Sequence, residues 1–193
     1  MSLHIGICTL NAMRTFPVVM DAIAQANLHD KLWVVDSGST DGTVEFAKNH
    51  GAHVIHRTWD GFVGQHRFLL EHCRSQGGDW ALMLDADEWP DPPLWKAIET
   101  FLADAPPAVS GAMLNRQLIL HGEPLRYVCQ PEHRLRLVRP ERSTVVGSFG
   151  EQAEGVHEQI QTEGKTVRLV GMLMHDSFFD LEDALSKNLG YAR

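Results

Sequence analysis

The sequence predicts an α/β fold in which a mixed, mostly parallel sheet is flanked by helices. In the first half of the chain, short apolar runs alternate with stretches of helical apolar spacing. In the second half, apolar runs follow one another without helices between them. One run in the first half ends directly in Asp85-Ala86-Asp87-Glu88. Acidic groups are therefore expected at the carboxyl end of a strand, where open α/β sheets bind their ligands.

The first half alternates between expected strands and expected helices. Strands are expected at 4–10, 32–36, 52–56 and 80–85, and helices at about 19–26, 43–50, 63–75 and 92–102. Thr40 or Asp41 should cap the second of these helices and Asp91 the last, since their side chains can accept hydrogen bonds from free first-turn amides. Parallel neighbours need a crossover connection, so this alternation predicts right-handed βαβ units.

The pattern changes after Ala105-Pro106-Pro107. Strands are expected at 110–121, 134–139, 156–161 and 166–174, followed by a helix from about 181. We expect one domain over residues 1–193, composed of halves 1–105 and 106–193. No stop signal marks Gly190-Tyr191-Ala192-Arg193, so we expect the natural chain to continue beyond this point.

Composition narrows the function classes. The net charge of -8, from 17 basic and 25 acidic residues, argues against a nucleic-acid partner. The cysteines Cys8, Cys73 and Cys129 are odd in number and widely spaced, which favours free thiols in a reducing compartment. No apolar stretch is long enough to span a membrane, and the histidines lack zinc-site spacing. We therefore expect a cytoplasmic protein, with peripheral contact at the inner membrane left open.

The acidic cluster predicts a metal site. Several carboxylates held this close repel one another, and a divalent cation with oxygen ligands would neutralise them. The competing interpretation is a solvated turn that leads into the helix capped by Asp91. That cap accounts for Asp91 but leaves Asp85 and Asp87 unexplained, so we favour the metal interpretation.

A second polar turn, residues 36–43, follows the strand at 32–36 and opens a helix. Its glycines permit positive φ, and the Asp36 carboxylate can accept hydrogen bonds from a base or a ribose. A capped βα loop without a ligand remains the alternative. The turn matches neither a phosphate-binding P-loop nor the dinucleotide fingerprint.

These motifs together resemble those of family 2 inverting glycosyltransferases, in particular the subgroup containing the lipopolysaccharide core β-1,4-glucosyltransferases. The matching segments are Thr9-Leu10-Asn11, residues 34–43, Trp59-Asp60-Gly61-Phe62 with Gln65 and Arg67, residues 84–88, Val156-His157-Glu158, Glu163-Gly164-Lys165 and residues 173–177. Their order and spacing make chance agreement improbable.

The resemblance implies a single GT-A domain that uses a UDP-sugar donor and Mg²⁺ or Mn²⁺. It implies that Asp85, Asp87 and His175 are the metal residues, with Asp87 preferred over Asp85 as the direct ligand and His175 a late ligand; Asp85 would also contact the donor. It also implies a uridine site at residues 1–105, with the acceptor bound by residues 106–193. The uridine site would be lined by Thr9, Asn11, Asp36 and Ser37, and Gln65 and Arg67 would face the donor. A packed histidine and a solvated helix arginine are the simpler interpretations of His175 and Arg67.

Inversion requires one carboxylate to remove the proton of the acceptor hydroxyl. Glu158 is the candidate base, because His157-Glu158 occupies a position that resembles the motif of the subgroup. Glu151 and Asp176 are rivals, and an exposed strand residue is the simpler interpretation of Glu158. The resemblance makes glucose the first guess for the transferred hexose, and a saccharide or glycolipid of the cell envelope the expected acceptor.

The sequence also departs from the subgroup. Ala12-Met13-Arg14 stand where acidic residues are common, and His66 lies in a segment that is usually less bulky. The alternating segment 134–139, near Arg126, either presents arginines to a phosphorylated acceptor or forms a solvated strand face.

Two other functions remain open. A sugar-nucleotide pyrophosphorylase would share the architecture, but Leu10-Asn11-Ala12-Met13-Arg14 lacks the glycine-rich N-terminal loop of that class. The second alternative is a non-catalytic module that binds a nucleotide sugar.

Overall fold

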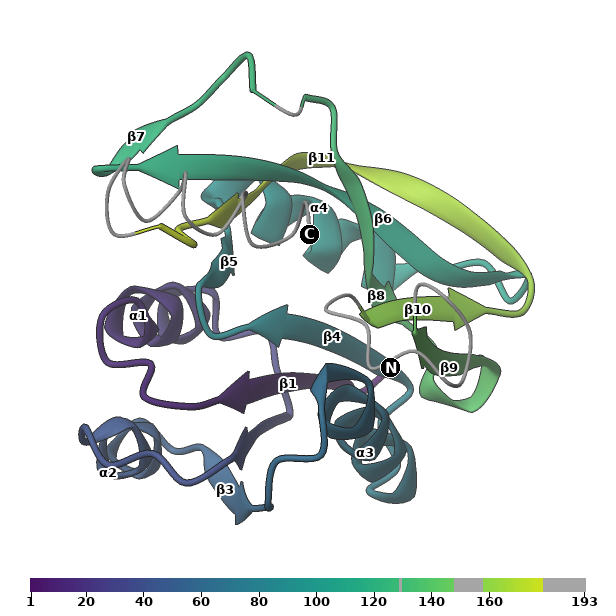
Figure 1. Cartoon of the computed structure of the whole chain (residues 1–193). Helices are drawn as coiled ribbons and strands as arrows, with labels where there is room; N and C mark the ends of the chain where they lie inside the picture. Colours follow the sequence, from purple (N-terminus) through teal and green to yellow (C-terminus); the bar gives the residue numbers. More distant parts are fainter. Residues whose placement is uncertain (129, 148–157, 179–193) are drawn as a thin grey trace.

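The computed structural model describes residues 1–128, 130–147 and 158–178. Its centre is a mixed sheet with the strand order β3-β2-β1-β4-β8-β6-β11-β5, and β7 pairs with β6 (Figure 1). The strands of this sheet are β1 Leu3–Thr9, β2 Lys31–Asp36, β3 His53–His56, β4 Trp80–Asp85, β5 Glu88–Pro90, β6 Val109–Leu120, β7 Glu123–Pro124, β8 His133–Val138 and β11 Lys165–His175. A separate antiparallel pair consists of β9 Ser143–Gly147 and β10 Glu158–Thr162.

The parallel strands β1 to β4 place the polar turns at one edge of the sheet. Their registers pair Thr9 with Asp36 and Cys8 with Asp85, so the carboxyl ends of β1, β2 and β4 coincide. Every residue of β4 before Asp85 is buried, as expected for a parallel strand covered on both faces. The predicted α/β fold with a mostly parallel first half is confirmed.

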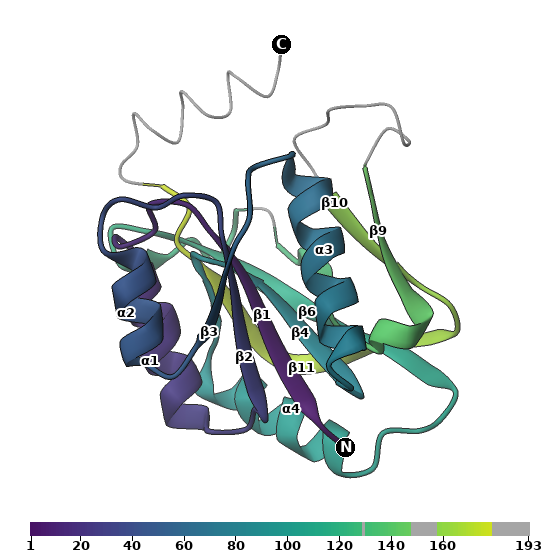
Figure 2. The same cartoon turned by 90° about the horizontal axis from the view of Figure 1, so that it is seen from below.

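Four α-helices complete the described part of the chain: α1 Phe16–Ala26, α2 Thr43–Asn49, α3 Phe62–Ser75 and α4 Pro92–Ala103. Helices α1 and α2 lie on one side of the parallel strands and α3 lies on the other (Figure 2). A short 3₁₀ helix, Pro140–Arg142, precedes β9. None of the helices in the described ranges is long and apolar enough to cross a membrane.

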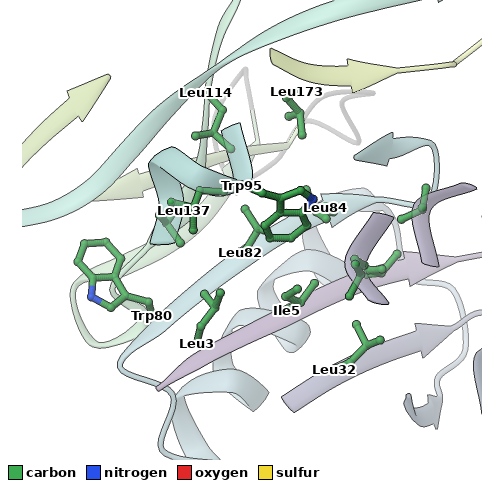
Figure 3. Close-up of a cluster of buried hydrophobic side chains, with 14 of the residues drawn as sticks. Leu3, Ile5, Leu32, Trp80, Leu82, Leu84, Trp95, Leu114, Leu137 and Leu173 are labelled. Carbon is green, nitrogen blue, oxygen red and sulfur yellow. The ribbon is translucent and has the colours of Figure 1, made fainter. Parts of the chain in front are cut away.

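The core has two parts because β4 sends alternate side chains to opposite faces. Leu82 and Leu84 join the larger cluster, which contains residues of α1 and α4 (Figure 3). Ala81 and Met83 join the smaller cluster, which contains residues of α3. Complete burial of a leucine side chain contributes about 1.5–3 kcal/mol, so these faces hold the strand ends in place.

The close approach of α3 to the sheet depends on Gly6. A Cβ at this position of β1 would lie 2.8 Å from Cγ of Leu69, so only glycine lets the helix pack at this depth. This contact fixes the height of α3 above β1. The residues that begin α3 are thereby held near the carboxyl edge of the sheet.

One predicted helix cap is wrong and another is confirmed. The N-cap of α2 is Gly42, with φ of 95°, rather than Thr40 or Asp41. The left-handed turn at Gly42 delays the helix, although Oδ1 of Asp41 still accepts the Thr43 N–H at 3.1 Å. Asp91 caps α4 as predicted, and its Oδ1 accepts the Leu94 N–H at 2.8 Å.

The second half follows the predicted strands with additions. The expected strands at 110–121, 134–139 and 166–174 correspond to β6, β8 and β11, and β6 and β11 run parallel. The strand expected at 156–161 corresponds to β10, which is described from Glu158 onward. Strands β5, β7 and β9 were not predicted. The helix expected from 181, as well as Cys129 and Glu151, lies outside the described residues.

Candidate functional site

A cavity of about 1140 Å³ opens at the carboxyl ends of the parallel strands. Its wall combines the loops after β1, β2 and β4 with residues of β6, β8, β10 and β11. The predicted site residues on this wall are Thr9, Asn11, Ser37, Asp85, Asp87, Glu158 and His175. The fold therefore brings residues from both halves of the chain to one cavity.

Asp36 lies beneath the cavity rather than on its wall. Its carboxylate accepts hydrogen bonds from the Thr9 hydroxyl at 3.0 Å and from the Ser39 hydroxyl at 2.5 Å. The amides of Gly38 and Ser39 donate to its other oxygen at 2.9 and 3.0 Å. Burial opposes ionisation, but these hydrogen bonds outweigh it and lower the pKa of Asp36. Asp36 thus shapes the turn that was predicted to hold uridine.

Asn11 connects the loop after β1 to the loop after β2. Its N–H donates to the Ser39 hydroxyl at 2.8 Å, and its side-chain oxygen accepts the Thr40 N–H at 2.8 Å. The backbone of Asn11 is left-handed, with φ of 49°, which asparagine tolerates better than most residues. The Ser37 N–H donates to the Thr9 carbonyl at 2.9 Å. These contacts fix Thr9, Asn11 and Ser37 on one side of the cavity.

Gln65 and Arg67 do not lie on the cavity wall, although we expected them to face a donor. Gln65 is fully buried, and its Nε2 donates to the Thr58 carbonyl at 2.9 Å. Arg67 donates through Nη2 to the Val145 carbonyl of β9 at 3.0 Å. His66, between them, is the residue of this group that lines the cavity. Both predicted side chains bind backbone carbonyls, and Arg67 is an exposed residue of the helix, in agreement with its simpler interpretation.

Asp85 is bound by two basic side chains. Its Oδ2 accepts a hydrogen bond from Nη2 of Arg136, and its Oδ1 lies 3.2 Å from Nε2 of His66. Burial works against the charged form, but Arg136 and His66 together hold the pKa of the Asp85 carboxyl well below its usual range. Burial also lowers the pKa of His66, yet the hydrogen bond and charge of Asp85 outweigh it, so this pKa is raised.

Arg136 is the functional residue whose environment the sequence did not reveal. Its side chain is 6% exposed and contacts Asp85, Glu88 and Glu158. The alternation of arginines at 134–139 was the available signal, but the solvated-face interpretation is wrong for Arg136. Arg134, on the same strand, is 37% exposed and pairs with Glu132. Arg126 is exposed and does not line the cavity.

Glu158 lies at the start of β10 and faces the cavity with only 13% of its side chain exposed. Nη1 of Arg136 lies 3.4 Å from its Oε1. The interpretation of Glu158 as an exposed strand residue is therefore wrong. Asp176, the rival candidate for the base that lies within the described residues, forms an ion pair with Arg14 at 3.1 Å. It does not line the cavity.

Two groups of side chains have the composition of a metal site. His66, Asp85 and Glu158 offer ligand atoms within 4.8 Å of one another, but Arg136 already contacts both carboxylates there. A second cation beside that buried guanidinium would be repelled. The other group is Asp87 and His175, whose Oδ2 and Nε2 lie 3.5 Å apart on the cavity wall.

The Asp87 and His175 pair fits a divalent cation better. The carboxylate oxygen of Asp87 is a donor that suits Mg²⁺ and Mn²⁺, and the imidazole nitrogen of His175 is a donor that suits several first-row transition metals. Burial lowers the pKa of His175, but Asp87 outweighs it and raises this pKa, so a proton competes with a metal ion for Nε2. The buried Nδ1 of His175 has no hydrogen-bond partner among the described residues. Asp85, with both oxygens engaged, is the less available of the predicted ligands.

Curated proteins with similar sequences include glycosyltransferases. An uncharacterized glycosyltransferase of Rickettsia prowazekii is 48% identical over 62 residues, which is 32% of this chain and 20% of that protein. The lipopolysaccharide core biosynthesis glycosyltransferase LpsC of Rhizobium meliloti is 28% identical over 170 residues, or 82% of this chain and 58% of LpsC. The chain thus spans only part of the length of these relatives.

Two solved structures illustrate the similarity in fold. Glucosyl-3-phosphoglycerate synthase of Mycobacterium tuberculosis, solved with Mn²⁺, UDP and phosphoglyceric acid, aligns with a TM-score of 0.61 at 18% identity, covering 100% of this chain and 75% of that one. TarS of S. aureus, solved with UDP, aligns with a TM-score of 0.52 at 15% identity, covering 72% of this chain and 47% of that one. These likenesses confirm the GT-A fold.

The model of the family described as "Glycosyl transferase family 2" matches residues 4–146, which contain the turn after β2, the acidic cluster and Arg136. The match extends over most of the chain and over most of the cavity wall that precedes β10. On this evidence the chain belongs to glycosyl transferase family 2.

Proposed function

We propose that this protein transfers a hexose, with inversion, from a UDP-sugar to a saccharide acceptor, using Mg²⁺ or Mn²⁺. The observation that carries the proposal is the shared cavity, in which Asn11 and Ser37, the pair of Asp87 and His175, and Glu158 lie on one wall. Family membership favours transfer over the pyrophosphorylase alternative. Glucose is the first choice for the hexose.

The polar loops would hold the nucleotide. Thr9, Asn11 and Ser37 are fixed by hydrogen bonds between the loops after β1 and β2, so their remaining polar groups are preorganised for uridine. The described complex of the mycobacterial synthase contains both UDP and Mn²⁺, which supports this donor class for a chain of the same fold. Asp36 would contribute indirectly, because its hydrogen bonds hold the shape of the turn.

Asp87 and His175 would hold the metal. When bound, the cation supplies positive charge to the diphosphate and stabilises the departing UDP. Asp85 would not bind it directly, because Arg136 and His66 already engage both of its oxygens. We infer that Asp85 instead keeps His66 and Arg136 in place beside the diphosphate.

Glu158 would act as the general base in a single displacement. Its carboxylate accepts the proton of the acceptor hydroxyl, while that oxygen bonds to the anomeric carbon and the bond from this carbon to the UDP oxygen breaks. Attack from the face opposite UDP inverts the anomeric configuration. Arg136 orients the carboxylate through the contact at 3.4 Å.

The name of LpsC supports an acceptor in lipopolysaccharide core or another cell-envelope glycan. If the acceptor is a glycolipid, the reaction takes place at the cytoplasmic face of the inner membrane, with the protein in peripheral contact.

Calorimetric titration with UDP tests the donor site. We expect binding that requires Mn²⁺ or Mg²⁺ in the wild-type protein and is lost in Asp87→Ala. Asp104→Ala is the matched control, because Asp104 is an exposed acidic residue that does not line the cavity. Absence of UDP binding with either metal would contradict the proposed function.

A further inference from the structure

Two aromatic side chains stand exposed at the cavity. Trp59 is 45% exposed and Phe62 is 44% exposed, whereas Trp33, Trp80 and Trp95 are buried. The rings of Trp59 and Phe62 pack edge to face, with centroids 4.9 Å apart and an interplanar angle of 90°. Both residues line the cavity. Exposed aromatic surface of this kind, bordering a polar cavity, usually marks a binding site.

The loop that carries Trp59 is held in one conformation. Arg57 forms a two-pronged ion pair with Asp60, in which Nη2 donates to Oδ2 at 2.5 Å. The Arg57 guanidinium also lies 5.0 Å from the centre of the Phe68 ring on α3. Gln65, fully buried, donates to the carbonyl of Thr58 at 2.9 Å. These contacts fix the backbone on both sides of Trp59.

Helix packing adds a further constraint on this loop. A Cβ at Gly64 would lie 2.4 Å from the carboxylate of Asp60, so the loop rests directly on the first turn of α3. A preorganised aromatic surface loses little conformational entropy when it binds a ligand. The loop therefore keeps the side chains of Trp59 and Phe62 exposed at the cavity rather than buried.

The aromatic pair lies on the Glu158 side of the cavity. The carbonyl of Phe62 lies 2.9 Å from Nδ1 of His66, one helical turn further along α3. His66 also belongs, with Asp85 and Glu158, to a group whose ligand atoms all lie within 4.8 Å of one another. Figure 2 shows α3 next to β10 and on the opposite side of the parallel strands from α1 and α2.

We propose that Trp59 and Phe62 form a stacking subsite for a pyranose ring of the saccharide acceptor. This inference rests on the proposed function and specifies where the acceptor binds. Hydrogen atoms on the ring carbons of a pyranose form an apolar, weakly positive face, which complements the negative face of an aromatic ring. The hydroxyl groups project from the edge of the same ring, toward a wall that contains His66 and Glu158.

The charge of the wall distinguishes this occupant from a lipid surface. The aromatic pair borders a cavity that also contains Asp85, Arg136 and Glu158, so a purely apolar partner would exclude water from these charged groups. A pyranose offers an apolar face to the rings and hydroxyl groups to the charged residues. Its chemistry matches both parts of the wall.

Titration with methyl β-D-glucopyranoside, in the presence of UDP and Mn²⁺, tests the subsite. D-Sorbitol is the matched probe, because it carries a similar set of hydroxyl groups without a ring face. We expect the wild-type protein to bind the glucoside and not sorbitol. Trp59→Ala should weaken glucoside binding by about tenfold, whereas Trp59→Phe, which keeps an aromatic face, should stay within about threefold.

Controls separate the subsite from general effects. Tyr127→Ala removes an aromatic side chain that is 97% exposed and lies away from the cavity wall, and should leave glucoside binding unchanged. The dissociation constant of UDP with Mn²⁺ should be the same in Trp59→Ala and wild type. Unaltered urea unfolding of Trp59→Ala would show that the fold is intact.

The results can overturn the subsite without overturning the proposed function. If UDP binds but the wild-type protein does not bind the glucoside, or if Trp59→Ala binds it as tightly as wild type, the subsite is wrong. A loss of UDP affinity in Trp59→Ala would move the aromatic pair to the donor, which also contradicts the inference. If Trp59→Ala differs from wild type only in its binding to anionic phospholipid vesicles, the aromatic pair contacts a membrane surface instead, and the subsite is wrong. If UDP itself does not bind, the proposed function fails, and glucoside binding by the free protein still decides whether a sugar site exists.

Discussion

Arg136 and Glu88 form a buried ion pair in which Nη2 lies 3.0 Å from Oε1, with 6% and 0% of the two side chains exposed. The same guanidinium contacts Asp85 and Glu158, so strand β8 connects the ends of β4, β5 and β10 through one side chain. Burial raises the pKa of Glu88, whereas the charge of Arg136 acts to lower it. The candidate base and the acidic cluster therefore share one structural support.

Replacement of Arg136 by methionine should strongly destabilise the protein. The methionine side chain keeps much of the apolar volume but leaves Asp85, Glu88 and Glu158 without their shared cation. Breaking a buried ion pair by removing one partner costs about 3–5 kcal/mol. Urea unfolding should show this loss in the free energy of unfolding.

Arg134→Met is the matched control for Arg136→Met. Arg134 lies on the same strand, but its side chain is 37% exposed and it forms an ion pair with Glu132. Exposed pairs contribute about 0–1 kcal/mol, so this variant should remain close to wild type. Equal destabilisation of the two variants would show that Arg136 does not have the structural role described above.

The positions of the candidate site residues could be predicted from the sequence where the order of strands and helices along the chain determines them. Asp85 and Asp87 follow a buried apolar run, and register in a parallel sheet then places them beside the turn after β2. Strand β5, in contrast, contains only three residues and begins within the acidic cluster at Glu88, so no apolar pattern indicates it. Without β5 there was no buried partner for Arg136, and sequence alone could not distinguish a buried arginine from a solvated one.

The start of α3 shows a second limit of sequence reasoning. Gln65, His66 and Arg67 are consecutive, and a helix turns each of them in a different direction. Which one reaches the cavity depends on how α3 rotates against β1, and that rotation is set by the packing of Leu69 on Gly6. The sequence identified the segment, and tertiary packing selected His66 as the residue on the wall.

Replacement of Gly171 by alanine should be among the most damaging small changes in the chain. Gly171 lies in β11 with φ of 107°, and a Cβ there would be 2.4 Å from the backbone nitrogen of Leu94 on α4. Backbone strain of about 1–2 kcal/mol adds to an overpacking cost of about 1–3 kcal/mol. Thermal and urea unfolding measure the loss.

Gly122→Ala provides the comparison for Gly171→Ala. Gly122 also has positive φ, at 80°, but nothing lies within 4 Å of a Cβ at that position. This variant should show only the backbone strain, about 1–2 kcal/mol. If both variants lose the same stability, the close contact between β11 and α4 does not contribute.

His175→Ala should weaken the metal-dependent part of UDP binding. Removal of the imidazole whose Nε2 lies 3.5 Å from Oδ2 of Asp87 leaves the cation with fewer protein ligands. We expect at least about a tenfold loss of UDP affinity with Mn²⁺, by analogy with the cost of altering groups around a metal. The measurement is calorimetry with and without Mn²⁺, with His50→Ala, an exposed histidine on another face, as the control. A loss of the same size without metal would mean that His175 contacts UDP itself.

Histidines around Trp33 should make stability depend on pH. The rings of His72 and His4 lie with centroids 4.4 and 6.2 Å from that of Trp33, and burial lowers the pKa of both below the ordinary value of 6.5. The unfolded chain therefore takes up protons first as the pH falls. Their contribution to stability is present above about pH 6.5 and is lost as the pH falls below it.

His4→Gln tests this pH dependence. Glutamine can still accept the Trp33 indole hydrogen bond, which reaches Nδ1 of His4 at 3.4 Å, but it does not titrate. His66 and His175, with raised pKa values, act in the opposite direction, so the comparison is between variant and wild type. Between about pH 7.5 and about pH 5.5, His4→Gln should lose less unfolding free energy than wild type in urea. An equal or greater loss in the variant would show that protonation of His4 does not limit stability in this range.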